Sequence, residues 1–129
     1  MSSSPRELVL AALRCESTAR TPWIAYVGCH GGAMLGLSAA DYLQDPAAIA
    51  RGLASAAEIY RCDGLPVVFD LQIEAEVLGC RLEWSAENPP AVVSHPLAEG
   101  VALADLKLPQ PTDARIPLAL EATRLARQA

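Results

Sequence analysis

Residues 65–71 read LPVVFDL, and this stretch decides the fold class. It is a short run rich in β-branched residues that stays apolar until Asp70, which is typical of a strand buried on both faces. Residues 23–27 read WIAYV and have the same character. Because helical patterns separate the two runs, we predict parallel neighbouring strands joined by a crossover. The stretch therefore predicts an α/β fold.

Capping signals and apolar periodicity predict helices around these strands. Ser4 followed by Pro5 and Glu7 is a capping-box pattern at the start of the first helix. The remaining predicted elements are helices at 39–44, 46–62, 73–79 and 112–129, with hairpin strands at 80–84 and 91–94 before the last helix.

Several charged residues of these helices are expected to face solvent. Glu74 and Glu76 are two positions apart, so they do not share a helix face and are not a paired acid and base. In the last helix, Arg115, Arg124 and Arg127 are expected to solvate the side opposite the apolar residues.

Length and charge limit the classes of function. The 129 residues suffice for one domain, whereas a complete (β/α)8 barrel needs about 200–250. The formal net charge is -5 and no basic stripe is present, which disfavours binding to nucleic acid. No apolar run reaches the roughly 18 residues of a membrane span, and the start does not resemble a signal peptide. We therefore predict a cytoplasmic protein that binds neither nucleic acid nor membrane.

Asp70 is the candidate catalytic residue. A carboxylate at the C-terminal end of a parallel strand lies where α/β enzymes bind their ligands. A local role stays open, because Asp70 is also placed to cap the helix that follows.

The glycine-rich turn at residues 28–32 (GCHGG) follows the first predicted strand. Cys29 and His30 in this turn, with Tyr26 just before it, are candidate substrate-binding residues. The turn lacks the G-x-G-x-x-G and G-K-S/T patterns of phosphate-binding loops, so a tight turn is the simpler interpretation. Cys29 and His30 are potential metal ligands, but two ligands do not make a site, and the four cysteines lack zinc-module spacing. We predict no metal site, and thiols that are reduced.

Three segments are informative because of their order and spacing along the chain. They are residues 5–13 followed by Arg20-Thr21-Pro22, residues 69–80 around Asp70, and residues 113–117 at the start of the last helix. Together they resemble the uroporphyrinogen decarboxylase (URO-D) superfamily. Residues 69–80 are most similar to the branch that contains methylcobamide:coenzyme M methyltransferases and related corrinoid methyltransferases. The resemblance spans nearly the whole chain, but it covers only the first third or so of a family member.

This resemblance implies an N-terminal part of a (β/α)8 TIM barrel with an added β-hairpin. Residues 1–129 would form a single partial domain with the first two barrel strands at 23–27 and 67–69. Asp70 would correspond to the aspartate that, in the decarboxylases, faces the pyrrole nitrogens of the porphyrinogen. Decarboxylases also carry an arginine-rich loop that holds the substrate carboxylates, whereas residues 27–32 contain no arginine. The resemblance is therefore closer to the methyltransferases.

Three functions follow from the resemblance and stay open. The first is an N-terminal fragment or subunit of an enzyme that transfers a methyl group from a corrinoid to a thiol or related acceptor. The second is a decarboxylase-like tetrapyrrole enzyme, and the third is a non-catalytic truncated-barrel partner or assembly module. A small-molecule domain built on the 28–32 turn is a further alternative. The chain is expected to act as an enzyme only if the rest of the barrel is supplied.

Cofactors and partners follow from the same resemblance. In the methyltransferase branch, a His-x-Cys motif and a distant Cys in the later barrel hold zinc, which lowers the pKa of the thiol substrate. We therefore expect no cofactor on this segment alone, and corrinoid and zinc only in a complete assembly. Exposed strand edges predict self-association or a completing C-terminal chain, with a corrinoid protein as a further partner.

Overall fold

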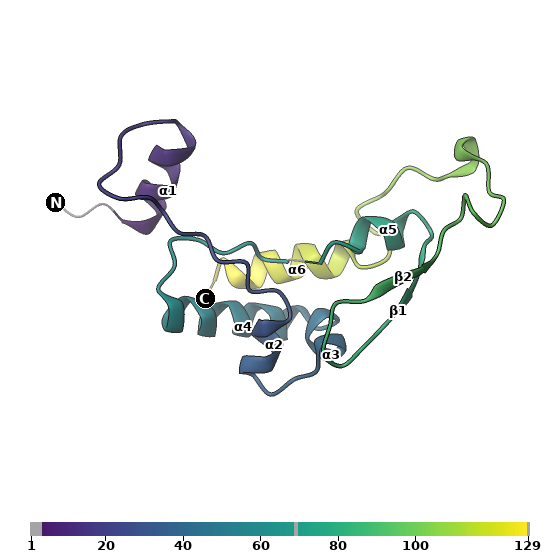
Figure 1. Ribbon diagram of the computed structural model, residues 1–129, viewed down its shortest axis with the longest axis horizontal. Helices are drawn as coiled ribbons and strands as arrows, with labels where there is room; N and C mark the ends of the chain where they lie inside the picture. Colours follow the sequence, from purple (N-terminus) through teal and green to yellow (C-terminus); the bar gives the residue numbers. More distant parts are fainter. Residues whose placement is uncertain (1–3, 69, 129) are drawn as a thin grey trace.

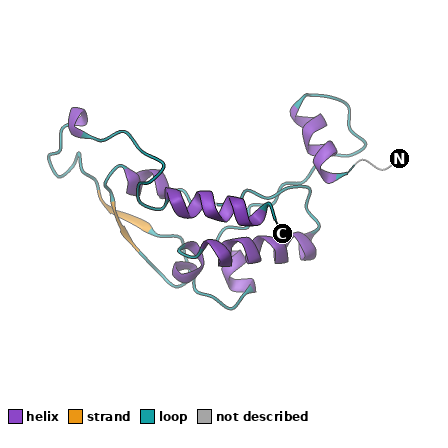
Figure 2. Ribbon diagram, turned by 180° about the vertical axis from the view of Figure 1, so that it is seen from behind, coloured by secondary structure: helices purple, strands orange, loops and turns teal. Residues whose placement is uncertain are grey.

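The computed structural model describes residues 4–68 and 70–128, and most of its regular structure is helical (Figures 1 and 2). The elements in chain order are α1 (Pro5–Leu13), α2 (His30–Met34), α3 (Ala39–Leu43), α4 (Pro46–Tyr60), α5 (Ile73–Val77), β1 (Arg81–Glu83), β2 (Ala91–Ser94), the 3-10 helix η1 (Leu103–Asp105) and α6 (Ile116–Ala126). Helices α4 and α6 lie side by side, with α1 at one end of the molecule and the hairpin towards the other. Within the described residues, the helices are too short or too polar to cross a bilayer.

Helix α4 contributes more residues to the core than any other described helix. The helix begins at Pro46, as predicted. The Asp45 carboxylate caps it by accepting the N–H of Ala47 at 2.8 Å, and Pro46 occupies the first turn. The chain leaves the helix at Arg61, whose φ of 49° is left-handed. The buried core cluster comprises Tyr42, Leu43, Ala48, Ile49, Leu53 and Ala122. Helices α3, α4 and α6 are therefore joined through one small apolar core.

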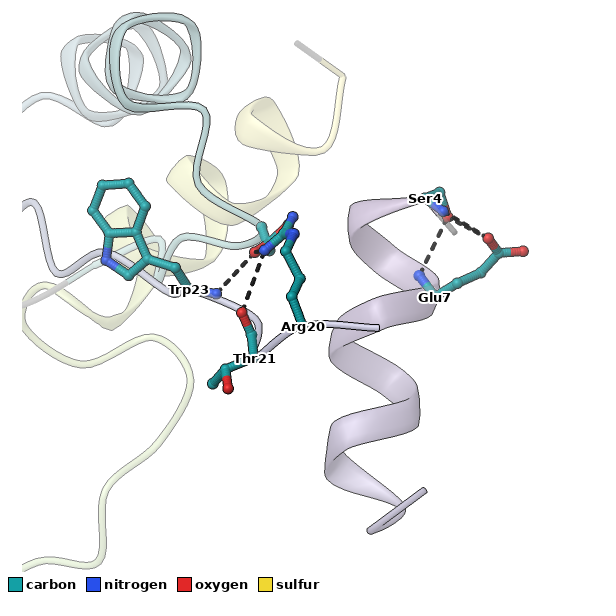
Figure 3. Close-up of polar contacts among 6 residues, drawn as sticks. Ser4, Glu7, Arg20, Thr21 and Trp23 are labelled. Atoms are coloured by element: carbon teal, nitrogen blue, oxygen red, sulfur yellow. Dashed lines mark hydrogen bonds and ion pairs between the residues drawn. The ribbon is translucent and has the colours of Figure 1, made fainter. Parts of the chain in front are cut away.

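Helix α1 confirms the predicted capping box (Figure 3). The backbone N–H of Glu7 donates to Ser4 Oγ at 3.3 Å, and the N–H of Ser4 donates to Glu7 Oε2 at 2.8 Å. The pKa of Glu7 is lowered by its hydrogen bonds to the backbone and side chain of Ser4. The start of this helix is therefore fixed by residues that are adjacent in sequence.

The prediction of two regular strands at 23–27 and 67–69 is wrong for the described residues, and Phe69 lies outside them. Among the described residues, the first segment forms an isolated parallel bridge from Ile24 to Gly64, which lies just before the second predicted strand. Trp23 is 52% exposed and Tyr26 is 69% exposed, so the first segment is not buried on both faces. Pro66 has no N–H to extend the ladder, and a barrel strand needs a neighbour on each side. The bridge is parallel, but the described residues contain no regular pairing of the two predicted strands.

The predicted hairpin is confirmed as the antiparallel pair of β1 and β2, in which Leu82 faces Val92. The last helix begins at Ile116, later than the predicted start at Thr112, with Pro117 in its first turn as expected. Helix α2 was not predicted, because Gly31 and Gly32 are poor helix formers.

A charged tether holds the first extended segment to the end of α4 (Figure 3). The Asp63 carboxylate is 2% exposed; it accepts two hydrogen bonds from Arg20 at 2.6 Å and the N–H of Trp23 at 2.8 Å. These hydrogen bonds lower the pKa of Asp63 to about 2, and the bond to Arg20 has the larger effect.

The stability that Asp63 contributes should therefore be lost in acid. Because its folded-state pKa is below the value of about 3.9 for an unfolded chain, the contribution is present above pH 4 and disappears as pH falls towards 2. In urea unfolding from pH 7 to pH 2, the gap in free energy between the wild type and Asp63→Asn should close below pH 4. Arg20→Gln removes the main cause of the shift and should show the same closing gap. A gap that is constant with pH would contradict this assignment.

Candidate functional site

Asp70 lies at the centre of a buried polar cluster. Its side chain is 0% exposed. Oδ1 accepts the backbone N–H of Gln72 at 2.9 Å, and Oδ2 accepts a hydrogen bond from Nη1 of Arg115. Asp70 therefore makes a local contact with Gln72, the residue that precedes α5, and an ion pair across 45 residues of sequence.

Arg115 is the site residue that the sequence did not reveal. It was expected in solvent, yet its side chain is only 10% exposed. Its Nε donates to Oε2 of Glu76 at 2.6 Å, and the guanidinium carbon lies 4.7 Å from the centroid of the Trp84 ring. The expectation that Glu76 is a solvated charge is therefore also wrong. Residues 113–117 contributed to the family resemblance, but no local pattern identifies Glu76 and Asp70, 39 and 45 positions earlier, as the partners of Arg115.

Two of the predicted substrate-binding residues, Tyr26 and Cys29, line one cavity of about 420 Å³. The other lining residues are Val27, Gly28, Leu71, Gln72, Glu87, Asn88 and Pro89. Asp70 borders this cavity through its chain neighbours Leu71 and Gln72, but it does not line it. The structure therefore brings Tyr26 and Cys29 together, with Asp70 buried behind them.

The Cys29 thiol is held in its neutral form. Partial burial raises its pKa, and the negative charge of Asp70 raises it further. A thiol with a raised pKa is a weak nucleophile at neutral pH, because only the thiolate attacks. Cys29 is therefore suited to contact a ligand rather than to react with it.

His30 does not line the cavity with Tyr26 and Cys29. Its Nε2 forms a hydrogen bond with the hydroxyl of Tyr60 at 2.6 Å, at the other end of α4 from Asp45. His30 is thus placed at the junction of α2 and α4, and the structure does not group it with the other candidates.

The glycine-rich turn uses its backbone donors internally. The N–H groups of His30, Gly31 and Gly32 donate to the carbonyls of Val27, Gly28 and Cys29, at 3.1, 3.2 and 3.0 Å. These donors cannot also cradle a phosphate, so the geometry favours the tight-turn interpretation.

Metal ligands do not cluster in the described part of the chain. Among residues 4–68 and 70–128, no group of three or more His, Cys, Asp or Glu side chains is placed to hold an ion. Four ligands are usual for zinc. The described residues therefore do not fit a resident zinc, and no chemistry is assigned to one on this chain.

Neutralising Asp70 is expected to make Cys29 more reactive. Asp70→Asn removes a charge that raises the pKa of Cys29, so more thiolate is present at a given pH. Alkylation by iodoacetamide, followed for each cysteine by mass spectrometry of its peptide, should be several-fold faster at Cys29 near neutral pH. The rate at exposed Cys15 should not change. An unchanged Cys29 rate would show that the charge of Asp70 does not reach the thiol.

Comparisons with known proteins identify a family that matches this chain. Residues 4–129 match the family model described as uroporphyrinogen decarboxylase (URO-D). No curated protein shows a significant sequence match to the chain. Among solved structures, a methyltransferase from Methanosarcina mazei is similar with a TM-score of 0.77 and 24% sequence identity. The similarity covers 98% of this chain but only 39% of the methyltransferase chain.

The structural similarity shows a shared fold, and the family model covers every residue that the structure describes. On this match, the chain belongs to the uroporphyrinogen decarboxylase family.

Proposed function

We propose that this chain is the N-terminal part of a (β/α)8 barrel methyltransferase, and that the complete protein transfers a methyl group from a corrinoid to a thiol or related acceptor. The observation that carries the proposal is the similarity of 98% of the chain to a methyltransferase structure. Since that similarity covers 39% of the methyltransferase, the rest of the barrel has to be supplied by further residues or by another chain.

The charge distribution near Asp70 favours methyl transfer over the decarboxylase alternative. A substrate with several carboxylates needs cations to neutralise and orient it. The turn at residues 27–32 has none, and Arg115 is already paired with Asp70 and Glu76. The lining of the cavity contains the neutral thiol of Cys29, the amide of Asn88 and the carboxylate of Glu87, and no lysine or arginine. Such a lining suits an uncharged part of a ligand better than a group of carboxylates.

In the proposed reaction, a methylated corrinoid would supply the methyl group and would keep the electron pair of the bond that it loses. The acceptor thiol would become a thioether and would release its proton to solvent. A zinc ion, when bound elsewhere in the complete assembly, would stabilise the acceptor as a thiolate. In this proposal the chain contributes part of the pocket wall around Asp70, Cys29 and Tyr26.

An apolar groove supports the proposal of a completing chain. It has a volume of about 440 Å³ and lies between α4, the C-terminal end of α6 and the second extended segment. Its lining comprises Ala50, Leu53, Ala54, Ala57, Glu58, Leu65, Val67, Ala126 and Arg127. Trp23 and Leu71, with 52% and 72% of their surface exposed, add apolar area outside the groove. We propose that the remaining barrel, on the same or a second chain, covers these surfaces.

The test of this function begins with the DNA downstream of the codon for Ala129. A continuation of the reading frame, or a second short frame, with His-x-Cys and a later Cys identifies the remaining part of the barrel. The complete assembly is then incubated with methylcobalamin and 2-mercaptoethanesulfonate, and loss of methylcobalamin is followed by its absorbance. Turnover that depends on both substrates supports the proposal. Decarboxylation of uroporphyrinogen without methyl transfer would favour the alternative enzyme.

Asp70→Asn provides the matched variant for this assay. If Asp70 is the ligand group at the end of the second segment, turnover or ligand binding should fall in the complete assembly. Unchanged kinetics would remove Asp70 from the site.

The exposed surfaces also favour a second function, that of a non-catalytic assembly module. Size-exclusion chromatography with light scattering on the 129-residue chain distinguishes a monomer from an associated form. Self-association, or capture by the completing chain, is expected if the apolar surfaces are interfaces. A stable compact monomer that does not bind the completing chain would argue against both self-association and completion by a second chain.

A further inference from the structure

The cluster around Arg115 is the strongest feature that the proposed function leaves unexplained. Arg115 precedes α6, whereas its partners come from the turn before α5, from α5 and from the residue after β1. A guanidinium this deeply buried, with contacts to three separate segments, is uncommon unless it is paired. Its arrangement points to a specific task.

The contacts of Arg115 are unequal. Glu76 is bound by Nε at 2.6 Å and Trp84 stacks on the guanidinium, so both hold the arginine independently of Asp70. Asp70 depends on a single guanidinium nitrogen and one backbone N–H. Loss of Asp70 would leave Arg115 anchored, whereas loss of Arg115 would leave Asp70 buried without a cation.

The Asp70 pair is also not the closed fork that arginine and carboxylate often form. Nη2 of Arg115 is buried and has no hydrogen-bond partner among the described residues. A bidentate pair would engage two nitrogens and be harder to displace. The present contact is therefore easier to displace than a bidentate pair, and it holds one carboxylate oxygen of Asp70 towards Arg115.

We infer that Arg115 is a positioning residue: anchored by Glu76 and Trp84, it holds the Asp70 carboxylate behind the cavity that Cys29 and Tyr26 line. This inference rests on the proposed ligand role of Asp70. Its test does not use methyl transfer, so failure of the inference and failure of the proposed function are distinguishable.

Cys29 serves as the reporter of where the carboxylate lies. The charge of Asp70 acts on this thiol, and the other titratable group that interacts with it is Tyr42. Burial raises the pKa of Tyr42 to about 12, so its phenol stays neutral in the experiment. A change in the pH midpoint of Cys29 alkylation therefore reports a change in the charge beside it.

The experiment measures the pH profile of Cys29 alkylation by iodoacetamide in the wild type, Arg115→Gln, Asp70→Asn and the double variant. If Arg115 positions Asp70, the freed carboxylate moves towards water, because an unpaired buried charge is costly. The midpoint should then fall in Arg115→Gln, as it does in Asp70→Asn, and the double variant should show no further fall.

Other outcomes would overturn the inference. If Arg115 only neutralises a carboxylate that stays in place, the midpoint rises in Arg115→Gln. If its role is only to support the fold, the plateau rate rises because Cys29 becomes more accessible, while the midpoint stays at the wild-type pH.

Arg115→Lys keeps the test decisive if Arg115→Gln fails to fold by circular dichroism. Lysine retains the charge, but its single ammonium cannot bridge Glu76 and Asp70 as the planar fork does. We expect a midpoint below that of the wild type. A wild-type midpoint in Arg115→Lys would show that any cation suffices and would refute positioning by the guanidinium.

Discussion

Arg115→Met is expected to lower the free energy of unfolding by about 3–5 kcal/mol, as is usual when one partner of a buried ion pair is removed. Methionine fills much of the same volume and can still pack on Trp84, so the loss comes mainly from charge. Asp70, with a side chain that is 0% exposed, would keep only the N–H of Gln72. Glu76 would lose its partner too, but it is partly exposed and can turn to water.

Urea unfolding followed by circular dichroism measures this loss, and two further variants identify its cause. Arg124→Met removes a pair with Glu121 whose side chains are 55% and 43% exposed, and it should cost much less, because solvent screens an exposed pair. Adding Asp70→Asn to Arg115→Met should recover part of the stability, because the stranded charge is gone. Equal losses in Arg115→Met and Arg124→Met would show that burial does not govern the pair.

Gly52→Ala is expected to destabilise the chain by about 1–3 kcal/mol, although alanine is the better helix former. A Cβ at this position of α4 would lie 2.7 Å from Cε2 of Tyr42 and 2.9 Å from the carbonyl oxygen of Gly31. Tyr42 is 2% exposed and its ring cannot turn away, and Gly31 O is backbone. The glycine therefore allows α2 and α4 to approach around one aromatic ring.

The matched control is Gly64→Ala, because a Cβ there would lie 3.5 Å from Ile24 Cγ1, an ordinary contact. Thermal unfolding should show a lower Tm for Gly52→Ala than for Gly64→Ala. If Gly52→Ala is as stable as the wild type, α2 and α4 are not packed closely around Tyr42.

Local patterns predicted the parts of the fold that depend on adjacent residues. The capping box of Ser4 and Glu7, the start of α4 at Asp45 and the hairpin all formed as predicted. Helix α2 and the irregular segment at 23–27 did not follow their local patterns. Gly31 and Gly32 lie in a helix that packs on Tyr42. The segment at 23–27 pairs with the second segment only at the bridge of Ile24 and Gly64, and Pro66 has no N–H with which to extend that pairing.

For the candidate site, the sequence identified Asp70 and Cys29 by their positions at the ends of apolar runs, and Tyr26 by its position just before the glycine-rich turn. It also grouped them with His30, which the structure places against Tyr60 instead. Position along a segment indicates which end of the segment a residue occupies, but not which way its side chain turns. The ligand roles of these four residues remain predictions for the completed barrel to test.

The sequence by itself determined the family, the starts of α1 and α4 and the presence of an acid after the second apolar run, because these depend on short segments and their order. Only the tertiary structure decided that Arg115 is buried and paired with both Asp70 and Glu76. The physical reason is that a buried carboxylate needs a cation, and the chain supplies it from 45 residues away, where no local pattern distinguishes a buried arginine from a solvated one.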